Sequence, residues 1–405
     1  MTSSTPATSI RSILGPAALI RLIIPWAGVV ALVLLHDVLA GPLSGPVLGI
    51  ALASIIVVIL IAAFGVVEQA EQLAHRLGDP YGSLVLTLSI VIIEVVLIAA
   101  VMLGPGEHAT IARDSVSAVS LIIMGFVLGL SMLVGGRRGG LAHNRVGTSQ
   151  YVAMIGILSV LAFVLPAVAG ADGSLRPAQI VPVAGLTAVV YVFFLWRQLG
   201  AQAGDFREVR AIATATATAS ASVGSSSGAG ARAAGAPQAD AEERTPVGEV
   251  LREHRSEILT RILLLVATMV PIVLLSHDLA TFLDDGIARI GAPTALSGAL
   301  IASIVFAPEA ITSVRAARGG EIQRVINLCL GALVSTVGLT IPAVLAIGAI
   351  TGSPVLLAET PAMLAILIAT IGLTAVTTAA PKLTSTHGAM HLAVFAVYGI
   401  LLFTT

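Results

Sequence analysis

Eleven stretches of about 20 mostly apolar residues run along this chain, and they constrain its fold more than any other feature. A helix needs about 20 residues to cross roughly 30 Å of hydrocarbon at 1.5 Å per residue. Only 11% of the 405 residues are charged, against roughly 25% in an ordinary soluble domain. The sequence therefore predicts an all-α integral membrane protein with about 11 transmembrane helices. The expected spans are 16–36, 46–67, 82–103, 115–135, 149–170, 179–199, 257–276, 294–316, 322–350, 355–379 and 386–404.

The composition also excludes several classes of function. The net charge of -1 offers no concentrated basic face, so no nucleic-acid partner is expected. The single cysteine, Cys329, excludes an internal disulfide and a thiolate metal cluster. No His-Glu-x-x-His motif or nucleophile with a base stands out, so we expect neither an enzyme nor a cofactor. The lipid bilayer is one expected partner, and the sequence does not predict an oligomeric state.

A low-complexity tract rich in Ala, Ser, Thr and Gly separates the sixth predicted span from the seventh. Such a composition buries too little apolar surface to offset the entropy of ordering, so 201–250 is predicted to be a disordered cytoplasmic linker. The chain then divides into a tail and first helix at 1–45, helices two to six at 46–200, the linker, and helices seven to eleven at 251–405. Charged residues at helical spacing in 67–77 predict a separate interfacial helix.

The distribution of Lys and Arg predicts the orientation in a bacterial inner membrane, because cytoplasmic loops carry an excess of these residues. With the N-terminus in the cytoplasm and the C-terminus external, the external loops keep only Arg113, Arg176 and Arg289. The cytoplasmic side then holds Arg11, Arg76, Arg137, Arg138, Arg145, the linker arginines, Arg315, Arg318, Arg324 and Lys382.

The two halves of the chain have similar patterns. Each has a helix of small and aliphatic residues with one acid near its centre, Glu94 in the first half and Glu309 in the second, followed by an arginine-bearing loop and a glycine-rich span. Five spans separate corresponding helices, so the halves run in opposite directions. The pattern predicts one extra N-terminal helix and two inverted five-helix repeats, a plan that places binding groups at the bilayer midplane.

Glu94 and Glu309 are the predicted cation-and-proton site. A carboxylate at mid-membrane costs at least about 2.5 kcal/mol, so it should face a polar cavity, a partner or a cation. One such acid could be a protonated group bonded to a neighbouring helix; two at equivalent positions favour a shared site where protons and a cation compete for the same oxygens. Pro308 lacks an amide donor and is predicted to break its helix beside this site.

Several polar residues are candidates for a supporting role. Hydroxyls in membrane helices often bond their own backbone, which is the alternative to ion binding for each of them. His387 and His391, near the start of the last span, either relay protons or pack at the interface. Acids outside the core, Asp114 and Glu359 among them, are expected to be solvated loop charges. The candidate secondary ligands are Ser89, Thr87, Ser303, Asn327, Ser335 and Thr336.

Around these acids the sequence resembles the bacterial calcium/proton and sodium-potassium/proton antiporters of the cation/calcium exchanger superfamily. The resemblance implies a sodium/calcium exchanger-like fold, with Glu94 and Glu309 as the essential carboxylates and transport by alternating access. The superfamily's usual Gly-Asn-x-x-Glu is absent around both acids, so Na⁺ and K⁺ stay open beside Ca²⁺ as the cation exchanged for H⁺. The segments that carry the resemblance are 73–84, 87–98, 112–114, 307–310, 314–317, 339–344 and 391–395.

Two other classes of membrane protein remain as alternatives. A cation channel would also place acids in a membrane, but channels generally build filters from rings of subunits or repeated filter loops, and no such loop is visible. A non-transporting scaffold predicts that Glu94 and Glu309 tolerate neutralisation. Coupled proton counter-transport distinguishes an antiporter from both.

Overall fold

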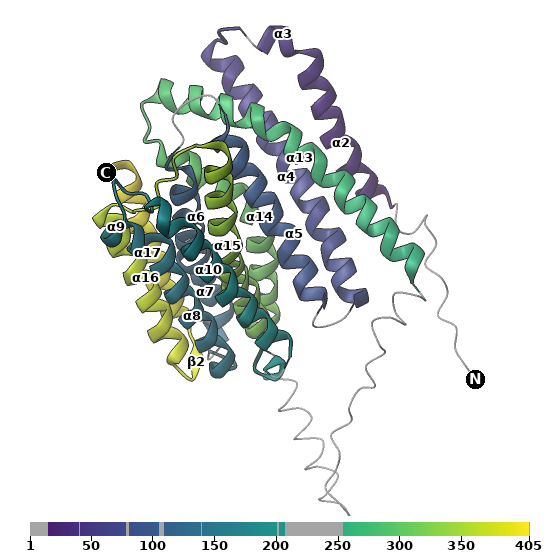
Figure 1. The fold of residues 1–405 in the computed structure, drawn as a ribbon. Helices are drawn as coiled ribbons and strands as arrows, with labels where there is room; N and C mark the ends of the chain where they lie inside the picture. Colours follow the sequence, from purple (N-terminus) through teal and green to yellow (C-terminus); the bar gives the residue numbers. More distant parts are fainter. Residues whose placement is uncertain are drawn as a thin grey trace, which may run out of the picture.

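The computed structural model describes residues 15–39, 41–77, 81–104, 109–138, 140–200, 202–206 and 254–404. Within these ranges, eleven helical segments are long and apolar enough to cross a membrane, which confirms the predicted class (Figure 1). The elements are α2 Pro16–Leu34, α3 His36–Leu39, α4 Gly45–Leu77, α5 Tyr81–Met102, α6 Ile111–Leu121, η1 Ile122–Val127, α7 Leu128–Gly135, η2 Gly136–Arg138, β1 Leu141–Ala142, α8 Arg145–Ser159, η3 Val160–Val164, α9 Leu165–Ala169, α10 Pro177–Leu199, η4 Ala203–Phe206, α13 Arg255–Ile290, α14 Ala295–Gly319, α15 Ile322–Thr351, α16 Pro361–Ala379, β2 Lys382–Leu383 and α17 Ser385–Thr404.

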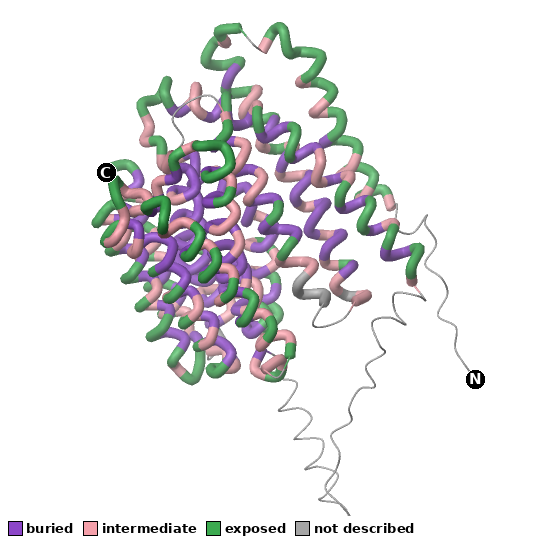
Figure 2. The backbone as a smooth tube through the Cα atoms, in the orientation of Figure 1, coloured by how far each residue is buried: buried purple, intermediate pink, exposed green. Residues whose placement is uncertain are grey.

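The helices of the two halves pack against one another in a single bundle. Helix α4 packs on α13, α6 and α7 pack on α14, and α15 packs on α5, α8 and α10. Figure 2 shows the buried segments gathered in the middle of this bundle, with exposed positions on its periphery. Strands β1 and β2 form a short antiparallel pair that pins the loop before α8 to the loop before α17.

Helix α2 is the extra N-terminal helix, and it lies at one edge of the bundle, beside α4 and α13 (Figure 1). Arg21 forms an ion pair with Glu68 of α4. The indole nitrogen of Trp26 donates to the carbonyl oxygen of Ala267 in α13 at 3.0 Å. The extra helix is therefore attached to corresponding helices of both repeats.

Helices α6 to α7 and α14 run side by side in the same direction. A Cβ atom at Gly298 would lie 2.6 Å from the backbone of Asp114, and one at Gly135 would lie 2.8 Å from the carbonyl oxygen of Ala317. Glycine is required at both contacts because any larger residue would push the helices apart. Gly298 and Asp114 are at the same height in these two parallel helices, so residues that follow them by equal numbers are also level. Glu309 comes eleven residues after Gly298, and position 125 in η1 comes eleven residues after Asp114. The π-helical segment η1 therefore lies level with Glu309.

The predicted break at Pro308 is wrong, because α14 continues through it as one helix from Ala295 to Gly319. A proline inside a helix leaves the carbonyl four residues earlier without its usual amide donor, and the remaining hydrogen bonds can still hold the helix together. The irregular backbone lies instead in the π-helical segments η1 and η3, neither of which the sequence analysis predicted.

Three predicted helix boundaries differ from the structure by more than five residues. The separate interfacial helix is wrong, because 67–77 continues α4 without interruption. Helix α13 extends to Ile290 rather than ending at 276, and its C-terminal turn carries the ion pair between Asp285 and Arg289. Helix α16 begins at Pro361 rather than at 355, because Thr360 caps it by accepting a hydrogen bond from the amide of Met363.

The structure describes only the start of the predicted linker. Residues 203–206 form η4, and Phe206 is buried against Tyr151 and Phe194. The side chain of Asn327 donates to the carbonyl oxygen of Phe206 at 2.7 Å. These contacts order the segment, whereas residues 207–250 of the prediction lie outside the described residues.

Candidate functional site

Glu94 is fully buried near the middle of its membrane span in α5. The hydroxyl of Thr336 in α15 lies 2.7 Å from its Oε2 and donates to it. Its other oxygen, Oε1, has no hydrogen-bond partner among the described residues. One oxygen of this carboxyl group is thus bound by a helix of the opposite repeat, and the other is buried without a hydrogen-bond partner among the described residues.

Glu309 occupies the corresponding depth in α14 and is 6% exposed. Neither of its carboxyl oxygens has a hydrogen-bond partner among the described residues. It is close enough to Glu71 of α4 and to Cys329 of α15 to interact with them electrostatically. A buried carboxylate with both oxygens unsatisfied is costly to keep in a membrane.

Helix α15 links the surroundings of the two acids. It packs against both α5 and α14. Cys329 lies two turns before Thr336 in α15. Its thiol is 3.6 Å from the hydroxyl of Ser313, which lies one turn after Glu309 in α14. Helix α15 therefore contacts the Glu94 carboxyl group directly and contacts α14 one turn from Glu309.

The π-helical segment η1 has a histidine bound to its backbone. The Nδ1 atom of His391 in α17 lies 2.7 Å from the carbonyl oxygen of Met124, and its Nε2 lies 3.0 Å from the hydroxyl of Thr377 in α16. A carbonyl only accepts, so Nδ1 carries a proton. His391 thus joins α16 and α17 to η1, whereas His387 accepts from the amide of Thr384 near the start of α17 at 3.3 Å. A relay role for either histidine stays a prediction.

Of the six candidate secondary ligands, the structure brings Thr336 to a carboxylate. Ser303 is exposed and donates to the carbonyl oxygen of Ala299, which separates it from the acids. Asn327 is engaged with Phe206 and Gln323.

The other three candidates are in α5 with Glu94 or in α15 beside Thr336. Ser89 is buried in α5 and bonds the carbonyl oxygen of Val85, while Thr87 is half-buried in the same helix. Ser335 donates to the carbonyl oxygen of Gly331 and accepts from Tyr191. Bonding to the backbone, the alternative considered for every hydroxyl, therefore applies to Ser89, Ser303 and Ser335.

Two buried hydroxyl groups in the central helices were not singled out from the sequence. Thr340, one turn beyond Thr336, and Ser131 in α7 are fully buried, and neither hydroxyl has a hydrogen-bond partner among the residues that the structure describes. Neither has a motif that distinguishes it from other hydroxyls in apolar helices. Among the described residues, no three His, Cys, Asp or Glu side chains gather closely enough to hold a metal ion together.

Asp114 and Glu359 were predicted to be solvated, and this is wrong: they are 7% and 8% exposed. Packing of the loop before α16 against the start of α6 covers them.

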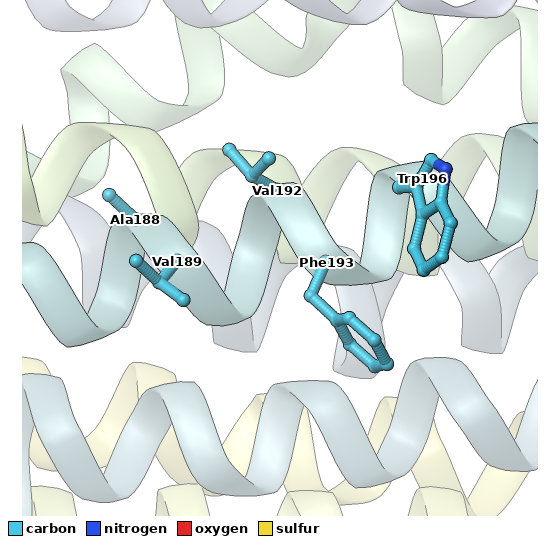
Figure 3. Close-up of a pocket in the computed structure, with 5 residues that line it drawn as sticks. All are labelled: Ala188, Val189, Val192, Phe193 and Trp196. Atoms are coloured by element: carbon cyan, nitrogen blue, oxygen red, sulfur yellow. The ribbon is translucent and has the colours of Figure 1, made fainter.

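The pocket in Figure 3 is separate from the acids. It lies on one face of α10 and is lined by Ala188, Val189, Val192, Phe193 and Trp196. Its lining contains no ionisable group, and four of the five side chains belong to large exposed hydrophobic residues. Such a face suits contact with lipid acyl chains.

An all-helical bundle of two inverted repeats, with one buried acid at mid-membrane in each, defines a secondary transporter rather than an enzyme. The family model for the sodium/calcium exchanger protein matches residues 47–200 and 260–404, so the chain belongs to this family of cation exchangers. Both matched segments lie within the predicted repeats, and the first helix lies outside them.

Two curated relatives and two solved structures agree with this assignment. The chain is 32% identical over 344 residues to the y4hA protein of Sinorhizobium fredii, covering 84% of this chain and 85% of the relative. It is 29% identical over 346 residues to the sodium-potassium/proton antiporter ChaA of Escherichia coli, covering 85% and 86%.

The solved structures show the same fold. That of native YfkE superimposes with a TM-score of 0.65 at 15% identity, covering 95% of this chain and all of that chain. That of the H⁺/Ca²⁺ exchanger CAX gives 0.60 at 12% identity, covering 95% and 89%.

Proposed function

We propose that this protein exports a cytoplasmic cation in exchange for external protons, using Glu94 and Glu309 as one cation-and-proton site. The observation that carries this proposal is the pair of buried carboxyl groups at mid-membrane, three of whose oxygens have no hydrogen-bond partner in the described part of the chain. Carboxylate oxygens suit both hard cations and protons. We propose Ca²⁺ as the first cation to test, with Na⁺ and K⁺ as the other candidates.

Competition between the cation and protons for the same carboxyl oxygens couples cation export to proton import. With neither ligand bound, two buried carboxylates repel each other in a medium that hydrates them poorly, so reorientation of the empty site is costly. A cation or protons neutralise the site and allow it to face the other side of the membrane. Each cycle therefore exchanges one ligand for the other, as alternating access requires.

The relatives support protons as the counter-ion. ChaA is named a sodium-potassium/proton antiporter and CAX an H⁺/Ca²⁺ exchanger. The two names agree on the proton but differ in the cation. Ca²⁺, Na⁺ and K⁺ are therefore all tested.

We further propose the arrangement in the membrane. The protein lies in a bacterial inner membrane, with 46–200 and 251–405 as the two repeats and 201–250 as a cytoplasmic linker. The excess of Lys and Arg in alternate loops supports an N-terminus inside and a C-terminus outside. The β1–β2 pair is then cytoplasmic, and the loop between α15 and α16 is external.

The test is cation-driven proton flux in everted membrane vesicles with an imposed pH gradient. Ca²⁺, Na⁺ and K⁺ are added separately to vesicles with the wild type, Glu94→Gln or Glu309→Gln. We expect one or more cations to collapse the gradient in the wild type and none in either variant. The matched control is Glu321→Gln, because Glu321 is an exposed acid paired with Arg324.

Two results would contradict the proposal. Variants that exchange as fast as the wild type would support a scaffold in which the acids have no transport role. Cation flux without any proton movement would support a channel.

A further inference from the structure

The loop between α15 and α16 folds into one end of the bundle instead of extending away from it. The amide of Leu356 donates to the carbonyl oxygen of Ala109 at 2.8 Å, and those of Leu357 and Ala358 donate to the carbonyl oxygen of Gly173 at 3.0 and 2.9 Å. We call residues 352–360 the plug loop. Its hydrophobic residues at 355 and 357 are buried, so it closes this end of the bundle.

The plug loop carries Glu359 into the interior. The Glu359 side chain is 3% exposed. Its Oε2 accepts from the amide of Thr360 at 3.3 Å and lies 3.8 Å from Nε of Arg113 in α6. Its Oε1 is buried and makes no hydrogen bond of good geometry with the described residues. This acid lies outside the glutamate site described above.

Arg113 is largely committed to another acid. Its Nε and Nη2 atoms each lie 2.8 Å from Oδ1 of Asp114, and its Nη1 donates to the carbonyl oxygen of Ala358 at 2.9 Å. Thr110 donates to the other oxygen of Asp114 at 2.7 Å. With Asp114 balanced by Arg113, an ionised Glu359 would add a surplus negative charge to a buried cluster.

The surroundings of Glu359 are consistent with a bound proton. Burial raises the pKa of Glu359, Asp114 adds to the rise, and the Ser117 hydroxyl and Arg113 oppose it. Tyr398 of α17 also interacts electrostatically with both acids. Within the part of the chain that the structure describes, Arg113, Asp114 and Tyr398 are thus the ionisable groups that interact with Glu359 from the packed helices.

We propose that Glu359 is a proton-binding site that keeps the plug loop closed over this end of the bundle. A proton from water outside bonds to Oε1 and turns the carboxylate into a neutral acid that tolerates burial. When the proton returns to water, the surplus charge favours hydration of the cluster, and the plug loop loosens. A conformation that binds a proton more tightly is favoured as pH falls.

The role in exchange rests on the proposed function, in which this end is external. An antiporter that imports protons must close its outer end after protons arrive. Protonation of Glu359 would make closure follow the arrival of protons, because external acid favours the closed plug loop. The proposal concerns loop closure and a proton at Glu359, and does not require that the proton continue to the glutamate site.

The experiment measures access to the plug loop directly. Val355 is 9% exposed and packs on Gly348, so Val355→Cys in a Cys329→Ala background reports opening. Intact cells are treated with a membrane-impermeant maleimide at about pH 6 and about pH 8.5, with and without Glu359→Gln. The thiol itself reacts faster at higher pH, so the labelling rates with and without Glu359→Gln are compared with each other at the same pH. Glu321→Gln is the matched control.

We expect labelling at the higher pH to be several-fold faster with Glu359 than with Glu359→Gln, and equal at the lower pH. Glu321→Gln should leave this pH dependence unchanged. Equal labelling with and without Glu359→Gln at both pH values would overturn the proposal, as would labelling in everted membranes alone. The assay needs no transport, so a pH-dependent plug loop in a protein without exchange activity would reject the proposed function while supporting this site.

If Val355→Cys does not fold, infrared spectroscopy on the purified protein gives a second test. The carbonyl band of a protonated carboxylic acid should be present near neutral pH in the wild type and reduced by one carboxyl in Glu359→Gln. Identical bands in both proteins would overturn the proposal.

Discussion

Thr336→Val tests the contact that most directly connects the two repeats. The substitution keeps the β-branched shape of a fully buried residue and removes the hydroxyl that donates to Glu94 at 2.7 Å. A hydrogen bond to a charged group contributes about 1.5–3 kcal/mol, and each 1.4 kcal/mol is a factor of about ten. We therefore expect the cation concentration for half-maximal exchange to rise by about 10- to 100-fold.

The assay is the cation dependence of proton flux in everted vesicles. Thr336→Ser keeps a hydroxyl and should restore most of the affinity. Thr370→Val is the matched control, because Thr370 is equally buried and donates to the backbone carbonyl of Ile366 in its own helix. Wild-type affinity in Thr336→Val would refute the reasoning, as would an equal loss in Thr336→Ser and Thr336→Val.

Two further predictions concern stability, measured by thermal unfolding in detergent. Burial lowers the pKa of His143, whose Nε2 lies 2.9 Å from the carbonyl oxygen of Thr378. As pH falls below about 6.5 the unfolded chain gains this proton before the folded protein does, so stability should fall by at most about 1.4 kcal/mol per pH unit. His143→Gln should flatten that slope, and an unchanged slope would contradict the assignment. Gly388→Ala should destabilise by about 1–3 kcal/mol, because its Cβ would lie 2.4 Å from the amide of Leu133. Gly372→Ala, with open space at Cβ, should be neutral, and equal effects would refute the close-packing argument.

Hydropathy was sufficient to predict the number and approximate positions of the spans, because a membrane imposes a minimum apolar length on every helix that crosses it. The acids in α5 and α14 were identifiable for a related reason: a carboxyl group in an apolar run has few structural uses. Helix ends were harder to predict. The start of α16 depends on the cap at Thr360 and on the plug loop, whose backbone partners Ala109 and Gly173 are distant in sequence.

The supporting residues could not be selected from the sequence. Ser303 and Thr336 have similar local surroundings, a hydroxyl in a run of small and aliphatic residues. The helical rotation that exposes Ser303 and directs Thr336 to Glu94 is fixed by packing between helices of opposite repeats. The burial of Glu359 likewise depends on tertiary contacts, so an acid that was predicted to be solvated lies in the interior.

The central claim is that protons and the cation compete for Glu94 and Glu309, and proton release on cation binding tests it most directly. Ca²⁺, and then Na⁺ and K⁺, are titrated into purified protein in weakly buffered detergent, with binding and pH recorded together. The account predicts that binding of the transported cation releases protons from the wild type, and that Glu94→Gln and Glu309→Gln weaken binding and reduce the release. Tight binding without proton release, or the same release from both variants, would contradict it.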